Sequence, residues 1–287
     1  MAPAAQLVPV GFSLAAVLCW GTSDFTGGYA SKRSDAFIVT LLSHAGGFTL
    51  VLTLALLAHA TYPSASSRNW ALLAGALGGS ALTIFYRALA SGNMGITAPV
   101  AAVLGAAIPA AFAMITQGPP GALSITGFLL AGVGIWLISR PDGSPGNYAG
   151  IWMAALAGVG FAGFFICIDR AGDSSALWAA VHSRFASLVI VAAIVLFRRA
   201  WMGPSPGRLQ TWGATLALFA GCLDVTGTAL FIRAEQTGRL DTAVVLSSLY
   251  PVITVLLARV VLHEQFTRWK TIGIFAALLA VPLIALQ

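Results

Sequence analysis

The chain has 287 residues, of which 58% are hydrophobic and only 8% are charged, and its mean hydropathy is +0.89. Soluble domains carry about 25% charged residues, so this composition excludes a soluble globular protein and makes lipid the solvent for most of the chain. The net charge of +6 is spread thinly between apolar runs. This spread indicates loop charges at a membrane surface and argues against a nucleic-acid partner.

Ten apolar segments follow one another along the chain, and each approaches the roughly 20 residues that a bilayer-spanning helix needs. They cover residues 9–30, 36–58, 69–90, 94–115, 121–139, 148–168, 175–197, 210–232, 240–262 and 268–286. The connections are short, and the runs are continuous rather than alternating, unlike the strands of a membrane β-barrel. The sequence therefore predicts an all-α membrane protein with ten transmembrane helices.

The two halves of the chain repeat one another. The stretch RALASGNMGITAPVAAVLG, from Arg87, aligns with RAEQTGRLDTAVVLSSLYP, from Arg233. An offset of 140 residues likewise places Ser43 on Ser183. Because five helices per half is an odd number, the second half must be inverted relative to the first. Inverted repeats are typical of transporters whose substrate site lies between the halves. We expect these five-helix repeats at residues 1–140 and 148–287.

The basic residues predict the orientation of the chain in the membrane. Ten lie in or beside the odd-numbered connections and four in the even-numbered ones, so the positive-inside rule places the odd connections in the cytoplasm and both termini outside. The ten are Lys32, Arg33, Arg87, Arg140, Arg198, Arg199, Arg208, Arg259, Arg268 and Lys270, and the four are Arg68, Arg170, Arg233 and Arg239.

Three charged residues lie well inside predicted spans: Asp24, Arg184 and Asp224. A charge at the bilayer centre costs at least about 2.5–3.5 kcal/mol, so such residues usually face a bundle interior or a water-filled cavity. Asp24 is a candidate carrier of a coupling proton or of a substrate ammonium group. The alternative is a structural carboxylate that is paired with Arg184 or hydrogen-bonded to Ser or Thr. Arg184 is a candidate clamp for a substrate carboxylate or a counter-ion of either acid. Neither acid is duplicated in the other half, which favours function over symmetry.

Further candidates for substrate binding or coupling are histidines and aromatic residues near these charges. His44 aligns with Arg184 at the repeat offset, which predicts a matched pair facing a shared cavity. The others are Trp20, which shares a helix face with Asp24, and Trp178, His182, Tyr86 and Tyr250. The alternatives are a neutral, hydrogen-bonded histidine and aromatic rings that serve only packing.

The chain offers no spacing typical of a metal site or a cofactor site. Its three cysteines, Cys19, Cys167 and Cys222, lie inside apolar runs and are expected to serve packing. GVGFAG at 158–163 fits a dinucleotide-binding pattern, but it lies inside a span with no preceding strand. Pro251, in SSLYPV, is the best candidate for a helix kink that opens the cavity.

Three further features point to one family: WGTSDF at 20–25, the two aligned stretches from Arg87 and Arg233, and LHEQFTRWKTIGIFAALLAV at 262–281. With them the sequence resembles the drug/metabolite transporter superfamily, specifically the ten-helix exporters with two EamA-like domains. The first motif is similar to the pattern that ends the family's first helix, the aligned stretches resemble its corner between the third and fourth helices, and the last motif resembles the opening of its last helix. The resemblance implies a central cavity, with helices 2 and 7 able to swing, and export of small amphipathic metabolites without ATP.

The sequence thus favours a secondary transporter of the cytoplasmic membrane. We expect it to export amino acids, purines or drug-like compounds by alternating access, with proton coupling left open, as a monomer or homodimer in contact with membrane lipid. Two alternatives stay open: a membrane scaffold or lipid-handling protein of the same fold, and an intramembrane aspartyl protease that uses Asp24 and Asp224. The absence of a Walker-type phosphate loop argues against ATP as the direct energy source.

Overall fold

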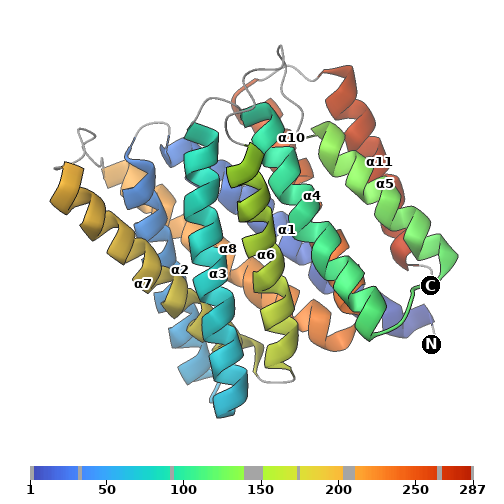
Figure 1. Ribbon diagram of the computed structural model, residues 1–287, viewed down its shortest axis with the longest axis horizontal. Helices are drawn as coiled ribbons and strands as arrows, with labels where there is room; N and C mark the ends of the chain where they lie inside the picture. The colour runs from blue at the N-terminus through green and yellow to red at the C-terminus, as the bar shows by residue number, and fades with distance from the viewer. Residues whose placement is uncertain are drawn as a thin grey trace.

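The computed structural model describes residues 3–31, 34–90, 94–138, 151–172, 175–202, 211–263 and 267–285, without the side chains of 3–6, 36, 86–90, 94–99 and 151. Every regular element in these ranges is an α-helix, and each predicted segment coincides with a helix except the ninth, which is divided (Figure 1). The helices are α1 Pro3–Ser31, α2 Ala36–Leu57, α3 Ala65–Ala90, α4 Met94–Thr116, α5 Ala122–Ile138, α6 Ile151–Ala171, α7 Ala176–Met202, α8 Thr211–Thr237, α9 Leu240–Ser247, α10 Pro251–Val261 and α11 Arg268–Ala285.

The described residues include seven stretches that are long and apolar enough to cross a membrane. They are Leu7–Ser31, Phe37–Leu57, Trp152–Ala171, Ala176–Trp201, Thr211–Thr237, Leu240–Val261 and Arg268–Ala285. α4 and α5 contain shorter apolar stretches, Val100–Thr116 and Ala122–Ile138. α3 is not among them, because its first turn is polar and glycines interrupt its middle. Large apolar side chains such as Ile115 and Trp152 are exposed on the outside of the bundle, as expected for a surface that faces lipid.

Helices that are far apart in the sequence pack side by side. α1 packs against α8, α3 against α6 and α7, α2 against α7 and α8, and α5 against α11. Figure 1 shows α5 and α11 as a pair at one edge of the bundle and α2 and α7 at the other, with both chain ends on one side of the molecule. The C-terminal ends of α1, α3 and α5 lie on the opposite side, so these helices run in the same direction through the bundle.

The ninth segment is broken at Pro251, where the sequence predicted a kink within one continuous helix. α9 ends at Ser247, and α10 begins at Pro251. Between them the backbone follows tighter i→i−3 hydrogen bonds, from Leu249 N to Leu246 O at 3.1 Å and from Tyr250 N to Ser247 O at 3.4 Å. Because proline has no N–H group and its ring clashes with the preceding turn, the helix restarts with Pro251 at its first position.

Two glycines allow the backbones of neighbouring helices to touch. Gly75 of α3 lies against the carbonyl of Ser183 in α7, and Gly221 of α8 lies against the carbonyl of Ser43 in α2. Hydrogen bonds reinforce both contacts: Ser187 Oγ donates to Gly75 O at 2.8 Å, and Ser43 Oγ donates to Ala217 O at 2.8 Å. Small residues and hydroxyl groups hold helices together in lipid in this way.

We expect Gly75→Ala to lower the stability of the protein by about 1–3 kcal/mol, because its Cβ would collide with the Ser183 carbonyl. Thermal unfolding of the purified protein in detergent measures this loss. Gly132→Ala in α5 is the matched control, since a Cβ there meets nothing within 4 Å and improves helix propensity. Equal unfolding temperatures for the two variants would contradict a tight α3–α7 contact.

Candidate functional site

An ion pair joins α7 and α8 in the interior of the bundle. Arg184 Nη2 lies 2.5 Å from Asp224 Oδ2, and the side chains are 10% and 36% exposed. The same Nη2 donates to Thr228 Oγ1 at 3.2 Å, while the Thr228 hydroxyl donates to the Asp224 carbonyl at 3.0 Å. Of the two acids that the sequence offered as partners of Arg184, the structure pairs it with Asp224. This pairing offsets the cost of a guanidinium inside the membrane.

His44 of α2 extends this cluster to a third helix. Its Nδ1 lies 2.8 Å from Arg184 Nη1, and both side chains are buried. A guanidinium can only donate hydrogen bonds, so His44 Nδ1 must accept, and the imidazole is neutral with its proton on Nε2. That Nε2 is buried and has no hydrogen-bond partner among the described residues. The two positions aligned by the repeat offset are therefore in direct contact and buried, rather than exposed in a cavity.

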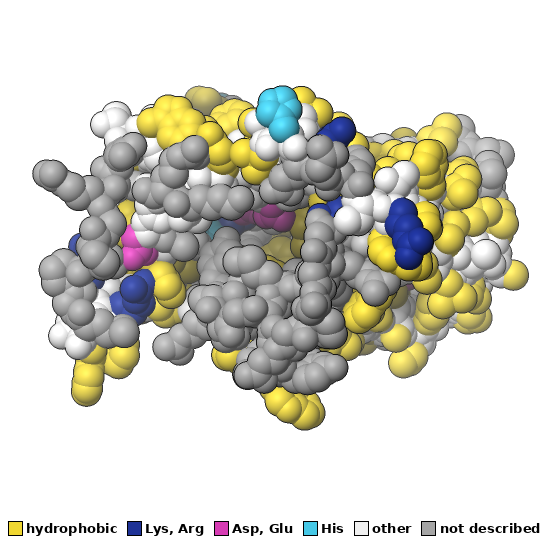
Figure 2. Space-filling view, turned by 90° about the horizontal axis from the view of Figure 1, so that it is seen from above, with side chains coloured by type: hydrophobic (Ala, Val, Ile, Leu, Met, Phe, Trp, Pro, Cys, Tyr) yellow, Lys and Arg dark blue, Asp and Glu magenta, His cyan; other side chains and the backbone are white. Residues whose placement is uncertain are grey.

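Asp24 of α1 lies close to this cluster and makes no ion pair or hydrogen bond within the part of the chain that the structure describes. It is within electrostatic range of Asp224, which is paired with Arg184 inside the bundle, and yet the Asp24 side chain is exposed. These two properties together place it in a solvent-accessible hollow of the bundle. Figure 2, which views the molecule from the side of the connections after α1, α3 and α5, shows a central hollow with acidic side chains visible inside it.

Trp20 sets the position of Asp24 one helical turn away. Its Nε1 donates to the Asp224 carbonyl at 3.1 Å, and the residue is only 9% exposed. Its ring fits against Gly227, where a Cβ would approach Cδ1 to 2.6 Å. Trp20 therefore locks α1 against α8 beside Asp224, and it serves as a positioning residue more than as an open surface for substrate.

Tyr250 lies at the break between α9 and α10. Its ring centroid is 6.3 Å from that of Trp20 in an edge-on arrangement, and Phe165 and Phe231 complete the aromatic cluster around the indole. This cluster packs around Trp20, one helical turn before Asp24 on α1. Tyr86 of α3 is the remaining aromatic candidate, and its side chain is not described. Glu264, in the LHEQ motif before the last helix, also lies outside the described residues.

Trp178 and His182 lie apart from the charged cluster. Trp178 Nε1 donates to Ala60 O at 2.9 Å, and His182 Nδ1 lies 2.8 Å from Trp178 O, a carbonyl that can only accept. His182 is thus protonated on Nδ1, and its Nε2 faces the Tyr62 hydroxyl at 3.4 Å. Since a helix turns 100° per residue, His182 lies about 200° around the helix axis from Arg184, on nearly the opposite face of α7. The pair anchors α7 to the connection between α2 and α3.

A second ion pair was not singled out from the sequence. Asp241, with no exposed surface, accepts from Arg239 Nη2 at 2.7 Å, and Arg239 Nη2 also donates to Gly118 O at 2.6 Å. Arg239 thereby connects the start of α9 with the residues that follow α4, so this ion pair has a structural role. The only signal in the sequence was the order Arg-Leu-Asp at the edge of a span.

The described residues contain no group of three or more His, Cys, Asp or Glu side chains that could hold a metal ion. The three cysteines are free thiols. The groups described at the hollow are therefore the carboxylate of Asp24, the neutral pair of Arg184 and Asp224, and the neutral imidazole of His44. Such a site can bind a cation or a proton and can release it again.

Fold and site together define a multi-pass helical membrane protein with charged groups around an internal hollow. Residues 148–286 match the model of the EamA-like transporter family. A solved structure, titled only as the crystal structure of a protein, is similar with a TM-score of 0.76 and 18% sequence identity, over 97% of this chain and 96% of that one. The likeness shows a shared fold. Comparison with curated proteins gives no match.

We expect Asp224→Asn to lower stability by about 1.5–3 kcal/mol, because Arg184 loses its charged partner inside the bundle. The partial exposure of Asp224 favours the lower end of this range. Asp24→Asn is the matched variant, and it should leave stability unchanged or raise it, since it removes a charge of like sign beside Asp224. Thermal unfolding in detergent distinguishes the two. An equal loss for both variants would mean that Asp24 has a structural partner.

Proposed function

We propose that the protein is a secondary transporter that exports small amphipathic metabolites, such as amino acids, purines or drug-like compounds, across the cytoplasmic membrane by alternating access. The observation that carries this proposal is Asp24, an exposed carboxylate without an ion-pair partner among the described residues, in a hollow that opens on one face. A membrane protein keeps such a group where an ion or substrate must bind and leave. A scaffold protein has no comparable use for it.

The packing of the helices supports two inverted halves, residues 1–140 and 148–287. α1 packs on α8 while α6 packs on α3, and α2 packs on α8 while α7 packs on α3. Each contact is thus matched by a second one in which the corresponding helices of the halves have exchanged places. The contacts at Gly75 and Ser183 and at Gly221 and Ser43 follow the same exchange, at the offsets of 146 and 140 seen in the sequence. Transporters built this way hold the substrate between their halves.

The charged cluster serves as the closed gate in this proposal. Arg184, His44 and Asp224 connect α7, α2 and α8, and the aromatic rings around Trp20 fill the bundle on the far side of Asp24 from the opening. A substrate can then enter the hollow from only one side of the membrane. Opening the other side would require α2 and α7 to part from α8, and that movement would separate Arg184 from Asp224.

The charges favour exchange of a proton for a cationic group at Asp24. Arg184 compensates Asp224 and His44 is neutral, so an ionised Asp24 leaves one uncompensated negative charge in the hollow. A proton or a substrate ammonium removes this charge, and the two cannot occupy the carboxylate at once. Such competition is a simple basis for coupled export. A monomer has the whole site, although a homodimer is equally compatible with it.

The arrangement does not suit an aspartyl protease. That chemistry needs two carboxylates that share one proton and activate water between them. Here one of the two acids is engaged by Arg184 at 2.5 Å. Incubation with candidate membrane substrates and no cleavage would remove the protease alternative.

We expect Asp24→Asn to abolish the pH dependence of transport in proteoliposomes, because the amide cannot exchange a proton at physiological pH. A thermal-shift screen against amino acids, nucleobases, sugars and cationic drugs first identifies a substrate, and the flux of that substrate is then followed under an imposed pH gradient. Asp24→Glu, which keeps the carboxylate, is the control and should retain gradient-driven flux. If the Asn variant still responds to the gradient as the unsubstituted protein does, Asp24 is not the proton carrier.

A further inference from the structure

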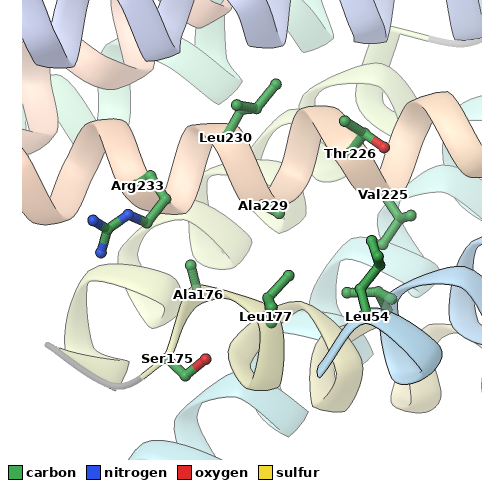
Figure 3. A pocket seen from close by; sticks show the side chains of 10 residues that line it. Leu54, Ser175, Ala176, Leu177, Val225, Thr226, Ala229, Leu230 and Arg233 are labelled. Carbon is green, nitrogen blue, oxygen red and sulfur yellow. The ribbon is translucent and has the colours of Figure 1, made fainter. Parts of the chain in front are cut away.

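A groove separate from the central hollow lies between α2, the start of α7 and α8. It has a volume of about 410 Å³ and is lined mainly by apolar side chains, among them Val51, Leu54, Leu177, Ala229 and Leu230. Figure 3 shows α8 along one side of it and residues 175–177 along the other, with Arg233 at one end and Leu54 and Val225 at the opposite end.

The groove runs from the level of the lipid headgroups into the hydrocarbon. α8 has 27 residues, which correspond to about 40 Å, the thickness of a bilayer with its headgroups. Arg233 lies four residues before the end of α8, about 6 Å from it, and so reaches the headgroup region. Val225 lies eight residues earlier, about 12 Å deeper. An amphipathic molecule anchored at Arg233 would therefore extend along the groove toward the middle of the membrane.

Among the described residues, no acidic side chain balances the charge at the shallow end of the groove. Arg233 is exposed, and its one hydrogen bond within the described residues is to the neutral Gln236 Oε1 at 3.4 Å. It forms no ion pair in that part of the chain. Basic side chains at the end of pockets between membrane helices attract anionic lipid headgroups. A guanidinium also matches the geometry of a phosphate with two parallel hydrogen bonds.

We propose that this groove is a binding site for an anionic phospholipid, with the phosphate held by Arg233 and one acyl chain lying between Leu54 and Leu177 on one side and Ala229 on the other. The membrane supplies this ligand at the required depth, whereas a soluble anion would leave the apolar wall unoccupied. The site does not depend on the transport proposal, since none of its lining residues belongs to the charged cluster around Arg184.

The position of the groove gives the lipid a consequence for movement. It lies between the α2–α7 pair and α8, the same helices that Arg184, His44 and Asp224 hold together. An acyl chain seated there would fill the space that closes or widens when these helices shift. Bound lipid would then stabilise the conformation of this structure, in which Arg184, His44 and Asp224 are in contact.

Native mass spectrometry of the purified protein, supplied with phosphatidylglycerol or phosphatidylcholine, tests the proposal. We expect retained phosphatidylglycerol to exceed phosphatidylcholine and to fall about fivefold in Arg233→Gln, the amount for one basic side chain at a membrane surface. Ala229→Phe fills the groove and keeps the charge, and it should lose the lipid as well. Arg68→Gln, on the same side of the membrane and outside the groove, is the control and should retain it.

Three results would overturn the proposal. Equal retention by Arg233→Gln and the unsubstituted protein would exclude the guanidinium as the phosphate ligand. Equal retention of the two lipids would reduce the groove to a non-selective acyl contact. Displacement of the lipid by a substrate found in the thermal-shift screen would assign the groove to the transport pathway. Unfolding temperatures measured on the same samples separate loss of lipid from loss of fold.

Discussion

The cost of placing an arginine inside a membrane governs the centre of this protein. Arg184 is tolerated there because a carboxylate, an imidazole nitrogen and a hydroxyl group from two neighbouring helices accept its hydrogen bonds. These acceptors fix α2, α7 and α8 relative to one another. The ion pair also neutralises Asp224, which leaves Asp24 as the acid of this region without an ion-pair partner among the described residues. The asymmetry between the two acids thus follows from the compensation of one buried cation.

Much of the architecture could be predicted from the sequence, because lipid imposes a simple rule on it. A helix must present about 20 apolar residues to cross a bilayer, so the helix bounds follow closely from the apolar runs, and Pro251 marks the one break within a predicted span. The repeat offsets also led to residues that touch. His44 and Arg184, aligned only by their spacing, lie 2.8 Å apart.

Other contacts could not be predicted, since they depend on which helix faces which. Asp24 and Asp224 were equal candidates for Arg184 in the sequence, and only the packing of α7 on α8 decides between them. Trp178 and His182 have the helical spacing of a site, yet they face the connection after α2 and support it. Arg239 was counted among the charges of the connections and Asp241 was not singled out, because both lie at the edge of a span, where burial depends on the neighbouring end of α4.

The glycine contacts have a consequence for how the bundle can move. Where Gly75 meets Ser183 and Gly221 meets Ser43, backbone lies directly on backbone, with no side chain between them to rearrange. Sliding at such a point would force atoms through one another, whereas rotation leaves the contact nearly unchanged. Each of the two points joins a helix of one proposed half to a helix of the other, α7 to α3 and α2 to α8, and can act as a pivot. In the proposed transport cycle, a tilt of α2 and α7 about these pivots would turn a small displacement at one membrane face into an opposite displacement at the other.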